Sequence, residues 1–206
     1  MVDTLLEVCV DSVASAEAAA EGGAARIELC SALSEGGLTP TLGLLKTIKK
    51  RVRIPVFCMV RPRGGPMVYS SAEEEVMLSD ARDLKYAGAD GLVFGALTSQ
   101  GNIHIEFCKS FREVAGDMPC TFHRAFDLLD EPLLALDTLI ELGFTRILTS
   151  GGAVSAIAGT STLFELHKIA GSRIIIMAGA GVRSSNVAAL LAKTGVFECH
   201  ASARVK

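Results

Sequence analysis

Two periods of hydrophobic and polar residues alternate along this chain, and the alternation repeats. Short runs rich in Val, Ile, Leu and Phe are separated by longer amphipathic segments, which end at a glycine and are followed by another apolar run. A glycine directly after a helix suits the left-handed conformation that closes it. The recurrence is clearest at Gly23, Gly88, Gly143 and Gly195. It indicates that one structural unit is repeated along the chain.

The pattern predicts eight strands and seven helices. Four strands follow the recurring glycines, and the other four are expected at residues 5–10, 54–60, 120–126 and 173–179. Helical patterns occupy residues 12–21, 42–51, 72–87, 105–115, 133–142, 162–170 and 186–193. Strands that alternate with helices indicate parallel β–α–β units.

Eight such units predict an α/β protein with the (β/α)₈ TIM-barrel fold, as one domain over residues 1–206. An open doubly wound sheet is the alternative, but no glycine-rich fingerprint follows the first strand. Only residues 203–206 follow the eighth strand, so we expect the terminal helix of the barrel to be lacking. Either the chain is a shortened barrel, or a partner chain covers the exposed strand faces.

Several strands place polar side chains toward the expected barrel interior. Side chains alternate along a strand, so the inward set can be inferred. It comprises Glu7, Cys9, Asp11, Glu28, Cys30, Thr121, His123, Glu198, His200 and Ser202. Buried charges are costly unless they are paired. One interpretation is therefore a salt-bridge layer of Glu7, Glu28, Glu198 and Arg61. We favour a pocket, because the C-terminal strand ends carry the active site in this fold.

Two stretches suit an anionic ligand. Arg61 and Arg63 flank a proline and precede two glycines, and paired guanidinium groups bind carboxylate or phosphate. A second set combines Ser150, Gly179, Gly181 and His200, which follow or end the last three strands. The loop with Gly179 and Gly181 leads into a helix, with Ser184 or Ser185 expected as its N-cap, and backbone N–H groups there bind anions. A tight strand-to-helix turn is the alternative reading of that loop.

His123 and a pair of cysteines offer two other kinds of chemistry. His123 is a candidate general acid or base, and Glu7 or Glu28 would orient it or share its proton; His200 is a second candidate. A hydrogen-bonded core histidine is the alternative for either position. Cys9 and Cys30 are expected at equivalent positions near the ends of neighbouring strands, and because adjacent parallel strands lie about 4.8 Å apart, the two thiols are expected to converge. Two thiolates suit a soft ion such as Cu(I).

Composition and charge argue against several classes of function. The net charge is −3, tryptophan is absent and no basic run contains aromatic residues, so nucleic-acid binding has no support. No apolar run approaches the ~18 residues of a membrane helix. The N-terminus has no signal-peptide pattern, so we expect a soluble cytoplasmic protein whose six cysteines are reduced. Nothing implies an organic cofactor.

The same stretches resemble the copper homeostasis protein CutC family. The matching segments are residues 6–12 (LEVCVDS), 26–30 (RIELC), 34–40 (SEGGLTP), 61–65 (RPRGG), 121–127 (TFHRAFD), 148–151 (LTSG) and 200–203 (HASA). The resemblance implies a TIM barrel, self-association as a dimer or tetramer, a cytoplasmic and also a nuclear location, and a link to copper tolerance with Cu(I) binding. Proposed copper ligands of animal members match Cys9 and Cys30. Pro66 departs from the family, which usually has Asp there.

Two hypotheses follow. In the first, the chain binds Cu(I) through Cys9 and Cys30. In the second, it is an enzyme acting by acid/base chemistry on a small anionic or phosphorylated metabolite, with His123 and Glu28 transferring protons. Arg61, Arg63 and the loop with Gly179 and Gly181 would then hold the anion.

Overall fold

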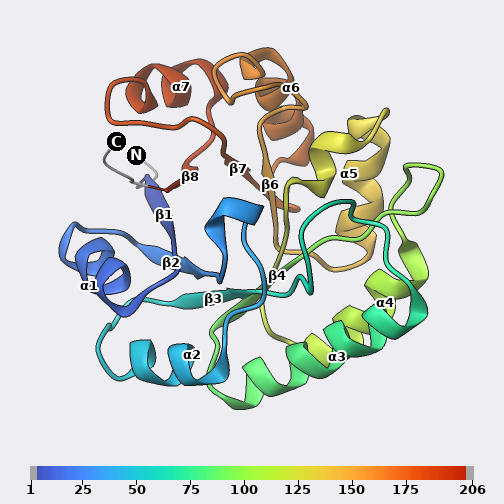
Figure 1. Cartoon of the computed structure of the whole chain (residues 1–206). Coiled ribbons are helices and arrows are strands. Elements are labelled where there is room, and N and C mark those ends of the chain that lie inside the picture. The colour runs from blue at the N-terminus through green and yellow to red at the C-terminus, as the bar shows by residue number, and fades with distance from the viewer. Residues whose placement is uncertain (1–3, 203–206) are drawn as a thin grey trace.

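Eight parallel strands form a closed barrel in the computed structural model, which describes residues 4–202 (Figure 1). The strands are β1 (Leu5–Val10), β2 (Arg26–Leu29), β3 (Val56–Met59), β4 (Gly91–Phe94), β5 (Cys120–Phe122), β6 (Arg146–Thr149), β7 (Ile175–Ala178) and β8 (Glu198–Ala201). Each strand pairs with the next along the chain, and β8 pairs with β1, so no strand edge is left open. The predicted TIM barrel is confirmed.

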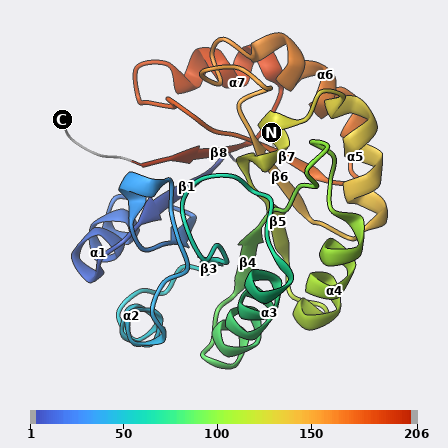
Figure 2. The same cartoon turned by 45° about the vertical axis from the view of Figure 1, so that its right-hand side comes forward.

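Seven α-helices surround this barrel in the described part of the chain. They are α1 (Val13–Glu21), α2 (Leu42–Lys49), α3 (Ser71–Tyr86), α4 (Ile105–Ala115), α5 (Pro132–Glu141), α6 (Thr160–Ala170) and α7 (Val187–Thr194). Two 3₁₀ helices, η1 (Leu33–Glu35) and η2 (Arg124–Leu128), follow β2 and β5. β1 and β8 lie between α1 and α7, where no helix of residues 4–202 covers the barrel (Figure 2). The expected lack of an eighth helix agrees with this; residues 203–206 lie outside the described range.

The first four helices, α1 to α4, begin at residues whose side chains cap them. Ser12 and Ser70 each accept a hydrogen bond from the third residue of the following helix and receive one in return, which forms a capping box. No helix within residues 4–202 is long and apolar enough to cross a membrane.

Apolar side chains form two separate clusters. The larger one fills the space between strands and helices; within it the rings of Phe94 and Phe111 stack with centroids 3.9 Å apart. The smaller one lies inside the barrel and contains Cys30, Phe57, Met59 and Val93. The interior is therefore only partly apolar, which leaves room for charged side chains above and below this cluster.

The structure corrects two local predictions. β5 ends at Phe122 rather than at residue 126, because the His123 side chain caps η2: its Nδ1 accepts the N–H of Ala125 at 3.1 Å. α7 has Asn186 rather than Ser184 or Ser185 at its N-cap position. The Asn186 side chain instead ties the preceding loop, accepting from the backbone N–H of Arg183 at 2.9 Å.

Candidate functional site

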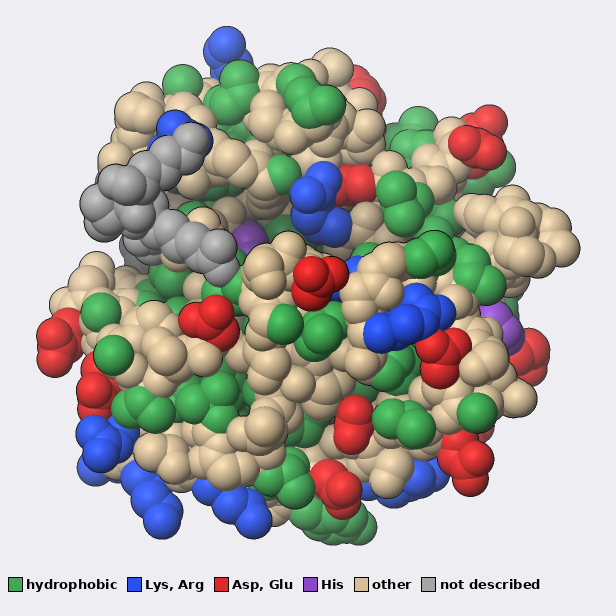
Figure 3. All heavy atoms as spheres, in the orientation of Figure 1, with side chains coloured by type: hydrophobic (Ala, Val, Ile, Leu, Met, Phe, Trp, Pro, Cys, Tyr) green, Lys and Arg blue, Asp and Glu red, His purple; other side chains and the backbone are tan. Residues whose placement is uncertain are grey.

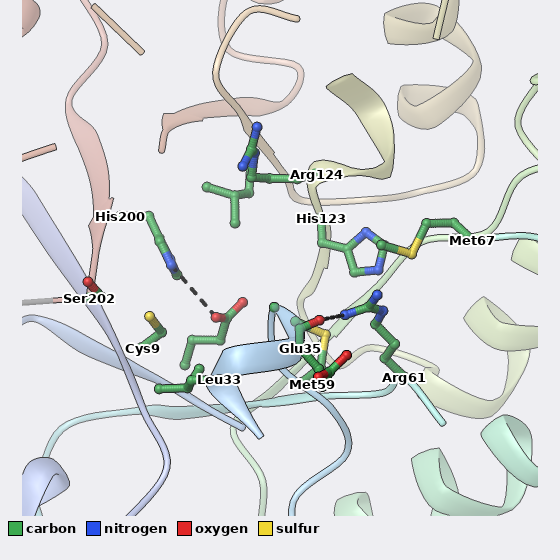
Figure 4. A pocket seen from close by; sticks show the side chains of 13 residues that line it. Cys9, Leu33, Glu35, Met59, Arg61, Met67, His123, Arg124, His200 and Ser202 are labelled. Carbon is green, nitrogen blue, oxygen red and sulfur yellow. Dashed lines mark hydrogen bonds and ion pairs between the residues drawn. The ribbon is translucent and has the colours of Figure 1, made fainter. Parts of the chain in front are cut away.

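A cavity of about 430 Å³ opens at the C-terminal ends of the strands. Its walls come from β1, β2, β3, β6 and β8 and from the loops after β2, β3 and β5. The same face of the molecule is hollowed near its middle, with acidic and basic side chains around the opening (Figure 3). Figure 4 shows two sides to this pocket. Cys9 and His200 lie on one side, and His123 and Arg61 lie on the other.

A layer of paired charges lies inside the barrel beneath this pocket. Arg26 donates from Nε to Glu7 at 2.5 Å and from Nη2 to Glu198 at 2.7 Å, and Arg146 donates from Nη2 to Glu198 at 3.0 Å. All four side chains are buried. Both guanidinium groups lie over the ring of Phe57, 4.9 Å and 5.6 Å from its centroid. The layer thus satisfies its charges internally and forms the floor of the site.

The salt-bridge layer differs from the one that the sequence suggested. Glu7 and Glu198 belong to it, but Glu28 and Arg61 do not, since both line the pocket above. The two arginines that complete it were not singled out. Both could have been predicted from the alternation of side chains along a strand, because residues two apart face the same side. Arg26 precedes inward-facing Glu28 by two positions, and Arg146 precedes pocket-lining Leu148 by two.

Glu7 connects this layer to the pocket through His200. Its Oε1 lies 2.8 Å from His200 Nδ1. Burial alone would raise the pKa of Glu7, but the hydrogen bond and charge of His200, together with Arg26, lower that pKa to about 2. Glu7 is therefore ionised. Burial also opposes the charged form of His200, yet Glu28, Cys9 and Glu7 raise its pKa well above 6.5. His200 is consequently held as a cation between acidic neighbours.

Cys9, Glu28 and His200 form the one group within residues 4–202 that could hold a metal ion. Their ligand atoms all lie within 4.8 Å of one another, and they come from the neighbouring strands β1, β2 and β8. The donors are one sulfur, one carboxylate oxygen and one imidazole nitrogen. Glu7 fixes the Nδ1 side of His200, so Nε2, 3.7 Å from Glu28, faces the group. A carboxylate on the far nitrogen of a histidine ligand is a recurrent feature of metal sites.

Cys30 does not join this group. The pairing of β1 with β2 sets Cys9 opposite Glu28, so Cys30 lies two residues further along its strand. The expectation that the two cysteines occupy equivalent positions was therefore wrong. Cys30 Sγ donates to Glu28 Oε2 at 3.6 Å and is otherwise enclosed by apolar side chains. Burial and the charge of Glu28 raise the pKa of Cys30 well above 9.0, so it stays a thiol.

His123 lies on the opposite side of the pocket, and its environment makes it neutral. Burial, and then the charge of Arg61, lower its pKa to about 3. Since Nδ1 accepts from the backbone of Ala125, the proton of the neutral ring is on Nε2. At neutral pH His123 is thus a hydrogen-bond donor and a poor general base. Glu7, which was expected to orient it, is bonded to Arg26 and His200 instead.

Arg61 lines the pocket beside His123 with its charge unmatched by any carboxylate among the described residues. Its terminal nitrogens donate to the backbone carbonyls of Glu35 at 2.7 Å, Gly37 at 3.1 Å and Gly65 at 3.1 Å. These bonds fix the loops after β2 and β3 around the guanidinium group. Its Nε is buried and has no partner.

The remaining candidates for anion binding lie outside the pocket lining. Arg63 turns toward α3, where Nε donates to Glu73 at 2.5 Å. Ser150 is bonded to the carboxylate of Asp127, its N–H lying 3.0 Å from Oδ1. Gly179 packs against Leu148 and His200, and Gly181 forms a turn with φ of 72°. Of the six residues expected to hold an anion, the structure brings only Arg61 and His200 to the pocket, on its opposite sides.

Known proteins match this chain over nearly its whole length. The CutC family model matches residues 4–205. The chain is 52% identical to "Copper homeostasis protein cutC homolog" of Homo sapiens, over 97% of this chain and 73% of that protein. It is 48% identical to the protein of the same name from Drosophila melanogaster, over 98% of this chain and 78% of the relative.

Solved structures show the same similarity. A crystal structure of a copper homeostasis protein CutC from Streptococcus agalactiae superposes with a TM-score of 0.91 at 32% identity, covering 97% of this chain and 98% of that one. Dihydrodipicolinate synthase from Bacillus anthracis, at 14% identity and a TM-score of 0.69 over 98% of this chain and 71% of that one, shares the barrel fold alone.

The fold and the site define a TIM-barrel protein with a sulfur, nitrogen and oxygen donor group at the C-terminal end of its strands. The CutC family model matches residues 4–205, and the relatives are about half identical to this chain over nearly all of it, so the chain belongs to the CutC family.

Proposed function

We propose that this chain acts in copper homeostasis and binds Cu(I) through Cys9 and His200, with Glu28 beside the ion. The observation that carries the proposal is the convergence of these three side chains within 4.8 Å. The names of the human and fly relatives support the choice of copper. A soft monovalent ion favours sulfur and imidazole nitrogen over oxygen.

The surroundings of the three side chains suit ion binding. Cys9 is half-buried and lines the pocket, so an ion can reach it, whereas Cys30 is fully buried. Glu7 holds His200 Nδ1 and leaves Nε2 for the ion. Thiol and imidazolium must each lose a proton before they bind a metal, and the carboxylate of Glu28 compensates positive charge. Cys9 and His200 therefore replace the pair of Cys9 and Cys30 as the proposed first ligands.

The test compares two single cysteine variants. Cu(I) binding is measured anaerobically by competition with a chromogenic chelator for wild type, Cys9→Ser and Cys30→Ser. We expect Cys9→Ser to lose the bound ion and Cys30→Ser to retain it. His200→Asn, whose amide can keep a hydrogen bond to Glu7, is expected to weaken binding at least tenfold. Unchanged stoichiometry in Cys9→Ser would refute the site, and equal loss in both variants would restore the two-cysteine arrangement.

Self-association and location stay predictions from the family resemblance. Light scattering coupled to size-exclusion chromatography would test for a dimer or tetramer, and a monomer across the concentration range would contradict it. Imaging of a fluorescent fusion would test the cytoplasmic and nuclear location.

A further inference from the structure

Three buried side-chain atoms lack a hydrogen-bond partner in the described part of the chain: Glu28 Oε1, Arg61 Nε and His123 Nε2. All three residues line the same pocket. Nearly all buried polar atoms in folded proteins are paired, so unpaired atoms gathered at one cavity indicate a ligand. Glu28 belongs to the proposed copper group. The other two lie together on the far side of the pocket, away from Cys9 (Figure 4).

Both remaining atoms are donors. The Nε2 of His123 carries a proton because Nδ1 accepts from Ala125, and Arg61 is always charged. Three of the four terminal N–H groups of Arg61 donate to backbone carbonyls, whereas its Nε is buried and has no partner. Two N–H groups beside one unmatched positive charge are complemented by a negatively charged oxygen. Such charge-assisted bonds are about twice as strong as neutral ones.

We propose that this pocket binds a small organic anion, whose carboxylate or phosphate oxygen accepts hydrogen bonds from His123 Nε2 and Arg61 Nε. The volume of about 430 Å³ falls within the range of small-molecule sites. Leu33, Met59 and Leu148 line the same cavity and provide apolar contact for a carbon skeleton. The site does not depend on copper, because none of these five residues belongs to the metal group.

Met67 lines the same pocket as the two donors. In Figure 4 its side chain points toward His123; it is half-buried, and its sulfur accepts a hydrogen bond from the hydroxyl of Tyr69 at 3.4 Å. Methionine is unbranched and adapts readily to new contacts. We therefore expect Met67 to adjust its packing when a ligand enters the pocket.

The probes are inorganic phosphate and propionate, titrated into ¹⁵N-labelled protein while the side-chain resonances of His123 are followed. We expect a saturable shift of Nε2 with at least one probe, and the preferred probe distinguishes phosphate from carboxylate. Arg61→Lys keeps the charge but removes the Nε donor, so its affinity is expected to fall at least tenfold. Arg63→Lys, outside the pocket, is the matched control and should bind like wild type.

A second variant separates this site from the copper site. Cys9→Ser should lose copper and still bind the anionic probe, while Arg61→Lys should do the reverse. The absence of a saturable His123 shift with both probes in the wild-type protein overturns the proposal, whether or not any variant folds. Equal affinity in wild type and Arg61→Lys overturns it as well.

Discussion

His123 makes the stability of this protein depend on pH in a defined window. Its pKa is about 3 in the folded chain, compared with 6.5 for an unperturbed histidine, because burial and Arg61 disfavour the cation. Well above pH 6.5 the side chain is neutral in the folded and in the unfolded chain, so its ionisation does not change the free energy of unfolding. As the pH falls from 6.5 toward 3, the unfolded chain takes up a proton that the folded chain cannot, so stability is lost progressively.

The magnitude follows from that difference in pKa. Between about pH 7 and about pH 5 the group should remove about 2 kcal/mol of folding free energy, at about 1.4 kcal/mol per pKa unit. His123→Asn removes the titration and keeps an acceptor near the backbone N–H of Ala125. Urea unfolding at both pH values should therefore show wild type losing about 2 kcal/mol more than this variant.

A matched control isolates the effect from other titrating groups. His167 lies on α6, outside the barrel, and His167→Asn leaves His123 and its surroundings in place, so this variant should keep the loss of stability that His123 causes. Burial raises the pKa of Glu28, which is present in wild type and in both variants. Its contribution to the pH dependence of stability therefore cancels when the three proteins are compared. If His123→Asn and wild type lose stability equally between the two pH values, the reasoning about the buried neutral histidine is wrong.

Two further predictions concern stability. Glu198→Gln leaves Arg26 paired with Glu7 but removes the carboxylate bonded to Arg146, and this unpaired buried cation should cost about 3–5 kcal/mol in urea unfolding. Glu17→Gln, which breaks an exposed pair with Arg51, should cost less than about 1 kcal/mol, and similar costs for both would contradict this account. Ala180 has a φ of 73°, so Ala180→Gly should raise stability by about 0.5–1 kcal/mol, whereas Ala178→Gly in β7 should lower it; a loss in Ala180→Gly would show that the turn is unstrained.

The order of elements could be predicted from the sequence because the local sequence of each β–α unit specifies its own strand and helix. β1 and α4 have the predicted bounds, and the other helices begin or end within two residues of them. Periodicity and capping residues act over a few positions, so they can be recognised in the sequence without knowledge of the tertiary structure. β5 failed for the same reason: its pattern continues beyond Phe122, but a side-chain bond from His123 turns the backbone into η2.

The site was less predictable because its contacts join separate strands. Inward direction follows from alternation, and it correctly brought Glu7, Cys9, Glu28 and His200 to the barrel interior. The stagger between strands does not follow from alternation. Because of that stagger, Cys9 lies opposite Glu28, and Cys30 lies two residues beyond it. The neutral state of His123 likewise depends on Arg61 from another strand.

The ion pairs that close the barrel also bear on the order of events during synthesis. Arg26 and Glu198 are 172 positions apart, and Glu7 and His200 are 193 apart. A nascent chain with seven strands made already has Glu7 to pair with Arg26, but it has no Glu198 to neutralise Arg146. The carboxylate that completes the buried layer therefore arrives with the last strand. Barrel closure is then a late step, because the pairing of β8 with β1 joins the two ends of the chain and contacts so distant in sequence form slowly.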